Sequence, residues 1–518
     1  MYRFVFGCLT YSSLCFHCLD MFYSKGDHTH RIPLVLHANN RKRLLAKLRK
    51  RQDVPDGSYV VLKGGKQGNL YSADVEPVFR QESYFMWTFG VTDADFLGAV
   101  NVDTGATILF APYVPESYAV WMGTIHDEKY FEQRYQVDKV VFYKGDDDGV
   151  IAKTLKENGA TKLLVLYGQN SDSGNFTEPA TFNGIEQFTV DNRILHPEIA
   201  ECRVIKTEEE IDVIAYTNKI SSEAHKQLML NVRSGWYEYQ AESLFLHHCY
   251  STGGMRHCSY TCIGATGCNC AVLHYGHAGE PNERKILPGD MALFDMGGEY
   301  YCYSSDITCS FPVDGKFTEN QKAIYNAVYD ANQAVFKAGK PGVSWLAMHN
   351  LAEKHVLKGL VQTGVLKSAH DHASVDEDEL NEMVTSRLGA VFMPHGLGHF
   401  MGLDVHDVNG YPAGTERLAD PGVRSLRTLR ALETNMVLTI EPGCYFIDPV
   451  LNKAIDDPKL GKWISKERLQ DFRGFGGVRI EDDVVVRENG IQNLTVVPRT
   501  VEEIEKFMAT RPAANGHA

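Results

Sequence analysis

Two aspartates in the stretch FDMGGEYYCYSSDITCSF have the spacing and the surroundings of metal ligands. Asp295 and Asp306 are eleven residues apart, with a Gly-Gly pair between them, and each lies in a strand-like run of mostly apolar neighbours. An ionised carboxylate in such a run is costly unless it is paired or bound to a metal. The alternative is a solvated strand face, which would carry further charged residues. Alone, the pair leaves both interpretations open.

Two further carboxylates accompany strand-like runs near the C-terminus. Glu441 ends the apolar run of MVLTIEPG, directly before a proline and a glycine. In GGVRIEDDVVV, the two-residue period of a strand predicts Arg479 and Glu481 on one face. An arginine beside a buried carboxylate can be a structural ion pair, so each feature is weak by itself. Together with a Gly-rich histidine segment, the four carboxylates are hard to explain by stability alone.

The histidine segment is MPHGLGHFMGLDVHD, residues 393–407. His395 and His399 have the spacing of the zinc ligands in the helical H-E-x-x-H motif, but Gly396 stands where the glutamate would be. Pro394 and three glycines make a helix unfavourable here. The two histidines are therefore not expected to share a helical face.

Four carboxylates and one imidazole predict a particular kind of metal centre. Such a ligand set suits Mn²⁺ or Co²⁺, with Zn²⁺ as a further option, and differs from the thiolate-rich sites of structural zinc. The negative charge is too large for one divalent ion and suits two. Two ions about 3.5–4 Å apart can share a hydroxide and polarise a carbonyl oxygen. The predicted chemistry is hydrolysis of an amide or an ester.

Composition indicates a globular protein with more than one domain. The chain has 518 residues, of which 44% are hydrophobic and 23% charged. Its formal net charge of −14 argues against nucleic-acid binding, and no stretch is long and apolar enough to predict a membrane span. Three of the twelve cysteines lie in the first eighteen residues, none lies between Leu19 and Glu201, and the rest are scattered over the chain that follows. We expect free thiols in a reducing compartment, and hence a cytoplasmic protein.

The chain divides into two parts of different character. Residues 30–195 alternate helical stretches with the strand-like runs SYVVLKGG, FLGAVNVDT, ATILFAPYV, KVVFYKG and KLLVLYG, as in an α/β domain. Residues 196–508 mix strands with long helices, and are expected to form an α+β domain. Thr207 with Glu210, and Thr318 with Gln321, have capping-box spacing at two helix starts. A further helix is expected over residues 237–250.

The two ends are expected to lie outside these domains. Residues 1–29 begin MYRFVFGCLTYSSLCFHCLDM, which could be a signal peptide, but Ser, Thr and His interrupt its apolar run. We favour an N-terminal extension, disordered or upstream of a natural start at Met21. Residues 509–518 are expected to be a frayed tail.

The order of the candidate ligands resembles that of the pita-bread metallopeptidases, which include methionine aminopeptidase, aminopeptidase P and prolidase. The segments AVLHYGHAG, MPHGLGHFMGLDVHDVNGYP, RSLRTLR and FRGFGGVRIEDDVVV are most similar to the prolidases, the Xaa-Pro dipeptidases. The resemblance extends from about residue 32 to 501. It implies an α/β N-terminal domain before an α+β pita-bread (creatinase/aminopeptidase-like) catalytic domain. It also implies cleavage of the Xaa-Pro imide bond of dipeptides, by attack of a metal-bridging hydroxide on the scissile carbonyl.

The resemblance assigns the metal ligands residue by residue. Asp295 would chelate one of two divalent ions, most simply Mn²⁺, while Asp306 and Glu481 would bridge the pair. His399 and Glu441 would complete the coordination of the second ion. Glu441 would also act as general base, passing a proton from water to the leaving proline nitrogen.

The resemblance also implies the contacts around the metals. His274 and His406 would line the pocket and bond the substrate or the tetrahedral intermediate, and Arg479 would hold ligand carboxylates. Arg427 would clamp the C-terminal carboxylate of the dipeptide. Tyr260 would line the pocket, and Trp121 would reach the active site of the second subunit of a homodimer. His395 is expected to support His399, and the role of His277 stays open. Asp404 and Asp407 are expected in turns or behind the ligands.

Three functions compete at this point. The first is a dimetal Xaa-Pro dipeptidase. The second is an Xaa-Pro aminopeptidase (aminopeptidase P) acting on longer peptides, which Arg427 and the long segment between Glu441 and Arg479 disfavour. The third is a non-catalytic pita-bread binding protein, which the five filled ligand positions disfavour.

Overall fold

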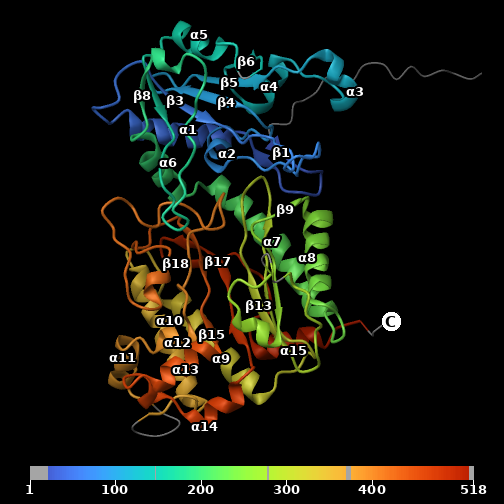
Figure 1. Ribbon diagram of the computed structural model, residues 1–518, viewed down its shortest axis with the longest axis vertical. Helices are drawn as coiled ribbons and strands as arrows, with labels where there is room; N and C mark the ends of the chain where they lie inside the picture. Colours follow the sequence, from blue (N-terminus) through green and yellow to red (C-terminus); the bar gives the residue numbers. More distant parts are fainter. Residues whose placement is uncertain (1–21, 146, 277–278, 280, 369–374, 513–518) are drawn as a thin grey trace, which may run out of the picture.

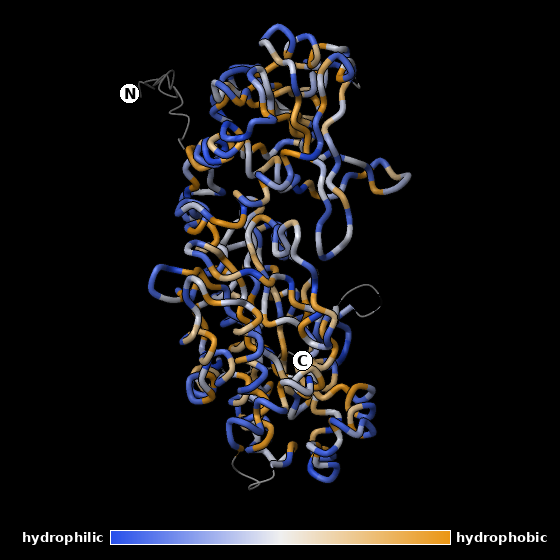
Figure 2. The backbone as a smooth tube through the Cα atoms, turned by 90° about the vertical axis from the view of Figure 1, so that its left-hand side faces the viewer, coloured by the Kyte–Doolittle hydropathy of each residue, from blue (hydrophilic) through white to orange (hydrophobic). Residues whose placement is uncertain are grey.

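The computed structural model describes residues 22–145, 147–276, 279, 281–368 and 375–512. An N-terminal domain stacks on a larger C-terminal domain along the long axis of the molecule (Figure 1). Hydrophobic and hydrophilic stretches alternate along the backbone of both domains (Figure 2). This alternation fits elements that each turn one face inward.

The N-terminal domain is built on a six-stranded mixed sheet in the order β6-β5-β4-β3-β7-β8. The central strand β3 pairs antiparallel with β4 and parallel with β7. The five strand-like runs are confirmed as β3 to β7. The strands are β3 (Ser58–Lys63), β4 (Leu97–Asn101), β5 (Thr107–Pro112), β6 (Lys139–Tyr143), β7 (Lys162–Val165) and β8 (Thr189–Asp191).

Helices cover both faces of this sheet, because successive residues of a strand point to opposite sides. Val60 and Leu62 of β3 pack in the cluster that contains α1 (Val35–Leu48) and α2 (Ser83–Phe89). Tyr59 and Val61 pack instead with α5 (Val150–Glu157). The α4 helix (Glu128–Tyr135) contacts β6. The predicted α/β character of this domain is confirmed.

Structural elements extend across both predicted boundaries of this domain. The α6 helix (Leu195–Val204) packs against α1 and β7, so the N-terminal layer continues past residue 195. At the other end, β1 (Phe22–Tyr23) pairs with β2 (Ile32–Pro33). Residues 22–29 are therefore part of the fold rather than of an extension, because strand pairing and ring stacking of Tyr23 on Tyr301 hold them. Residues 1–21 and 513–518 lie outside the described residues.

Long helices frame the C-terminal domain. They are α7 (Glu208–Asn231), α8 (Glu238–Gly253), α9 (Glu319–Ala338) and α10 (Trp345–Gln362). The capping boxes at Thr207 and Thr318 are confirmed, and α8 matches the helix expected over 237–250. The α7 helix packs on α8, and α9 packs on α10. Shorter helices are α11 (Glu377–Thr385), α12 (Gly389–Phe392), α13 (Asp448–Asp456), α14 (Lys466–Leu469) and α15 (Val501–Met508).

Small antiparallel sheets fill the space between these helices. One has the order β10-β11-β13, another β14-β17-β18, and two are pairs, β15-β16 and β9-β12. The strands are β9 (His257–Cys258), β10 (Ile263–Thr266), β11 (Met291–Asp295), β12 (Gly298–Glu299), β13 (Thr308–Pro312), β14 (Val437–Ile440), β15 (Gly443–Tyr445), β16 (Gly477–Arg479), β17 (Asp482–Arg487) and β18 (Gly490–Asn493).

Two strands are shorter than predicted. The run GGVRIEDDVVV is not one strand but two, because β16 ends at Arg479 and β17 begins at Asp482 in a different sheet. Asp306 lies before β13 rather than inside it. Asp306 and Glu481 therefore lie outside the strands. Their side chains need not follow the alternation of directions that a strand imposes on its residues.

Within the described residues, no helix combines the length and the apolar character that crossing a membrane requires.

Candidate active site

Breaks at strand ends bring the predicted ligands together. Asp295 is the last residue of β11, Glu441 directly follows β14, and Glu481 lies between β16 and β17. The loop that contains Leu397 and His399 is held against β14 by hydrogen bonds. His399 N–H donates to Thr439 Oγ1 at 3.1 Å, and Glu441 N–H donates to the carbonyl of Leu397 at 2.8 Å. Segments far apart in the sequence therefore meet at one point.

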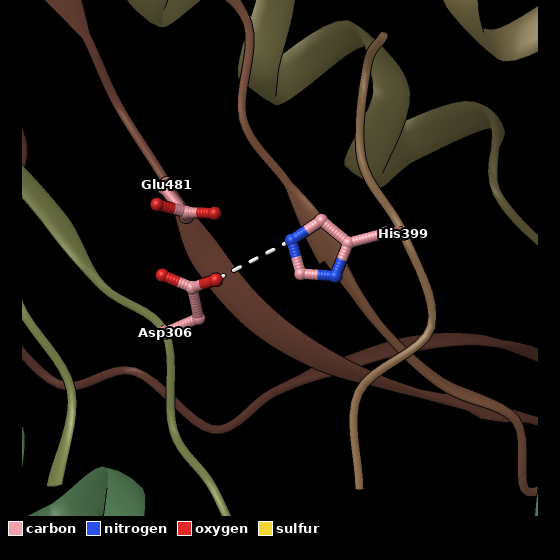
Figure 3. A group of neighbouring side chains, drawn as sticks. All are labelled: Asp306, His399 and Glu481. Carbon is pink, nitrogen blue, oxygen red and sulfur yellow. Dashed lines mark ion pairs between the residues drawn. The ribbon is translucent and has the colours of Figure 1, made fainter. Parts of the chain in front are cut away.

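Asp306, His399 and Glu481 form a compact set of donor atoms. One ligand atom from each residue lies within 4.8 Å of the other two, and all three residues are buried. Figure 3 shows the Asp306 carboxylate and the His399 ring facing each other from separate segments, with His399 Nε2 at 3.3 Å from Asp306 Oδ2. His399 Nε2 also lies 3.5 Å from Glu441 Oε1. The histidine segment contains no helix, as expected.

The electrostatics of this cluster favour a cation. Burial, followed by repulsion from neighbouring carboxylates, raises the pKa of Asp306 and Glu481 well above the usual range. Burial likewise raises the pKa of Glu441 to about 7 and lowers that of His399. Divalent cations would offset this repulsion and favour the ionised carboxylates. Buried oxygens plus one imidazole fit borderline-hard divalent ions, so the residues present suit the predicted metals.

Two hydrogen-bond donors fix the orientation of the Asp295 carboxylate. Arg479 Nη2 donates to Oδ2 at 2.5 Å, and Tyr260 Oη donates to Oδ1 at 2.5 Å. Arg479 also donates to Thr308 Oγ1 at 2.9 Å and to Tyr445 Oη at 2.9 Å. The guanidinium is thus held by three partners, which is compatible with the role that the resemblance implies for it, holding a ligand carboxylate.

Thr308 and Tyr445 complete this network, although no sequence pattern indicates them. Thr308 Oγ1 donates to Glu481 Oε2 at 2.6 Å, so it links Arg479 to a second carboxylate. Tyr445 contacts Arg479 from β15. Both residues are ordinary strand residues in their local sequence. Their only signal was closeness along the chain to Asp306 and Glu441.

Two further histidines, His395 and His406, stand around the carboxylates. The rings of His406 and His399 meet edge to face, with centroids 4.4 Å apart. His395 Nδ1 lies 3.8 Å from Glu441 Oε2 and 2.8 Å from the carbonyl of Gly396. Burial lowers the pKa of His395 to about 3, and it also lowers that of His406. Both rings are therefore neutral near pH 7. His277 lies outside the described residues.

The candidate residues line one cavity of about 750 Å³. It contains all five predicted ligands together with Tyr260, His274, His395, His406, Arg427 and Arg479. The lining residues that were not predicted include Ser171 and Asp172 from the N-terminal domain, and Arg417 from the C-terminal domain. Asp172 Oδ2 lies 3.1 Å from Arg427 Nη1. Both domains therefore contribute to the cavity wall.

Trp121 is not brought to this cavity. It lies on the short helix α3 (Ala119–Met122) with 84% of its surface exposed, beside Val120 and Met122, which are also exposed. Its predicted contact with a second subunit stays a prediction.

Comparison with known proteins identifies the class to which this fold and site belong. The model of metallopeptidase family M24 matches residues 212–488, and the aminopeptidase P N-terminal domain matches residues 37–164. The chain belongs to metallopeptidase family M24, and its predicted architecture, an α/β domain before a pita-bread catalytic domain, is confirmed.

Individual members of this family differ in their similarity to the chain. The chain is 55% identical to the Xaa-Pro dipeptidase of Homo sapiens, over 93% of this chain and 95% of the human one. A protein of Sordaria macrospora named as a probable Xaa-Pro aminopeptidase is 35% identical, over 88% of this chain and 93% of its own. Among solved structures, zinc-substituted E. coli aminopeptidase P in complex with product superposes with a TM-score of 0.72. Its sequence is 27% identical, over 93% of this chain and 99% of that one.

Proposed function

We propose that this metallopeptidase is an Xaa-Pro dipeptidase that cleaves the imide bond of dipeptides ending in proline. One observation carries the proposal: Arg427 lies in the same cavity as the five candidate metal ligands. A guanidinium there can pair with the free carboxylate that a dipeptide presents next to its scissile bond. The identity to the human Xaa-Pro dipeptidase supports the same substrate class.

We propose that the metal centre holds two divalent ions, most simply Mn²⁺. Asp295, Asp306, His399, Glu441 and Glu481 would hold them. When bound, the ions supply Lewis acidity, which lowers the pKa of water and polarises a carbonyl oxygen. The buried oxygen donors and the raised carboxylate pKa values support this assignment.

The chain's own residues would then bind the substrate and move its proton. Arg427 pairs with the proline carboxylate, and the rings of His274 and His406 bond the substrate's polar groups. Glu441, whose side chain keeps 17% of its surface open to the cavity, accepts a proton from water and gives it to the proline nitrogen. That nitrogen leaves as a secondary amine and needs the proton. Arg479 and Tyr260 hold Asp295 during this transfer.

A homodimer and a cytoplasmic location also belong to the proposal. The exposed apolar surface at Val120, Trp121 and Met122 suits contact with a second subunit. The nine cysteines among the described residues are all free thiols, as expected in a reducing compartment.

The competing function is an aminopeptidase acting on longer Xaa-Pro peptides, which the 35% identical relative favours. The two are separated by comparing kcat/KM on Gly-Pro and Gly-Pro-Gly with Mn²⁺-loaded protein. We expect Gly-Pro to be strongly preferred, because only the dipeptide places a carboxylate at Arg427. Equal or faster cleavage of the tripeptide would favour the aminopeptidase, and no cleavage of either would favour a binding protein.

A further inference from the structure

Asp172 lines the active-site cavity from the loop between β7 and β8. The connection between β7 and β8 descends from the N-terminal sheet toward the C-terminal domain (Figure 1). Within it, Gln169 pairs with Phe176, and the ring of Phe176 stacks on Tyr167 at 5.1 Å. Asn170 Oδ1 accepts from the backbone N–H of Asp172 at 2.9 Å. The loop is therefore braced by its own contacts, and its carboxylate is delivered in a defined place.

Two arginines of the C-terminal domain meet this one carboxylate. Asp172 Oδ1 accepts from Arg417 Nη2 at 2.6 Å, and Oδ2 lies 3.1 Å from Arg427 Nη1. The side chain of Asp172 is only 15% exposed. The pair of arginines thus carries two positive charges against one negative charge, and one positive charge remains for a ligand.

Arg417 is the fixed member of this set. Its Nη1 donates to the carbonyl of Leu426 at 2.6 Å, its Nη2 also donates to the carbonyl of Ser171 at 3.2 Å, and its guanidinium lies over the Tyr411 ring at 4.3 Å. Among the hydrogen bonds and ion pairs of the described residues, the Arg427 guanidinium pairs with Asp172 alone. Arg427 is therefore the arginine that retains free N–H donors for a substrate carboxylate.

The simplest alternative is that Asp172 only ties the two domains together. Partly exposed ion pairs contribute little to stability, and such a tie would not need a position inside the cavity lining. A purely structural role also does not explain why two guanidiniums contact one carboxylate in the cavity that holds the candidate metal ligands.

We propose that Asp172 is a specificity-determining residue that restricts the enzyme to substrates with a carboxylate directly at Arg427. The inference rests on the proposed dipeptidase function. A dipeptide carboxylate balances the remaining positive charge, so the set becomes two guanidiniums with two carboxylates. A longer peptide presents a neutral amide to Arg427 and carries its carboxylate further along the chain, where the negative charge of Asp172 repels it.

The test is the ratio of kcat/KM for Gly-Pro to kcat/KM for Gly-Pro-Gly. In Asp172→Asn the arginines lose their counter-ion, so the carboxylate of the tripeptide is attracted instead of repelled. We expect the ratio to fall roughly tenfold or more, the size of effect that a nearby like charge has on specificity. Asp172→Glu keeps the charge and should keep most of the preference.

The matched control is Glu178→Gln, which removes the same charge from the same connection. Glu178 is 85% exposed and pairs with Lys63 outside the cavity, so its ratio should equal that of the wild type. An unchanged ratio in a folded Asp172→Asn protein would refute the inference. So would equal falls in Asp172→Asn and Glu178→Gln. If the wild-type protein does not cleave Gly-Pro at all, the proposed function fails first, and the two failures are thereby distinguished.

Discussion

At the scale of single residues, the carboxylates of the site differ in the charges that surround them. Asp295 has Arg479, whereas the pKa values of Asp306 and Glu481 are raised by burial and by their neighbours' charges. Breaking such a balance by removing one member costs more than a surface substitution, because a buried charge is left uncompensated. The assignment of the ligands can therefore be tested one residue at a time.

Asp306→Asn should abolish binding of the proposed metal pair, because a neutral amide is a much weaker ligand for divalent cations than an anionic carboxylate. We expect metal content to fall well below two ions per chain in elemental analysis of dialysed protein, with a large loss of Gly-Pro hydrolysis. Asp330→Asn removes the same charge from an exposed position on α9 and should bind metal like the wild type. Retention of two ions in Asp306→Asn would refute its bridging position.

Arg427→Ala should reduce kcat/KM for Gly-Pro much more than for Gly-Pro-Gly, because only the dipeptide loses a paired carboxylate. A hydrogen bond to a charged group contributes about 1.5–3 kcal/mol, which corresponds to roughly 10- to 150-fold in kcat/KM for the dipeptide. The control is Arg424→Ala, an exposed arginine of the same loop. Equal losses on both peptides would contradict the role of Arg427 as a clamp.

At the scale of secondary structure, the site is made where strands end. The sequence predicted the five strand-like runs of β3 to β7, the capping boxes of α7 and α9, and the candidate ligands themselves, because these signals are local. It did not predict that β16 and β17 are separate strands, since the run of alternating residues continues through the break at Glu481. It also missed Asp172 and Arg417, which meet across two domains and have no local pattern.

At Gly398 the strand β14 packs so closely that there is no room for a side chain. A Cβ there would lie 2.1 Å from the carbonyl oxygen of Thr439, on the strand next to Glu441. Gly398→Ala should push the His399 loop away from β14, with a loss of about 1–3 kcal/mol of stability and weaker metal binding. Thermal unfolding and metal titration would measure both effects. Gly68→Ala, in open space, should change neither, and wild-type behaviour of Gly398→Ala would contradict the packing argument.

At the scale of the whole molecule, folding and metal binding are linked through the buried carboxylates. Their pKa values are raised in the folded state, so they stabilise the metal-free fold at low pH. This stability is lost as pH rises from about 4.5 through the folded-state pKa, which is about 7 for Glu441. Metal ions need the ionised ligands and therefore bind more strongly as pH rises.

We therefore expect the rise in Tm on adding Mn²⁺ to chelated protein to be larger at pH 8 than at pH 5.5. The metal-free protein alone should become less stable over the same range. Differential scanning calorimetry at several pH values would measure both trends. A rise in Tm that is independent of pH would contradict this linkage.

The central claim is that the cluster around Asp306, His399 and Glu481 is a metal centre for cleavage of Xaa-Pro dipeptides. The most direct measurement is proline release from Gly-Pro by the purified full-length chain, before chelation, after chelation, and after Mn²⁺ is restored. We predict hydrolysis that disappears on chelation and returns with Mn²⁺. Hydrolysis that persists without any divalent metal, or its absence under every metal condition, would contradict the claim.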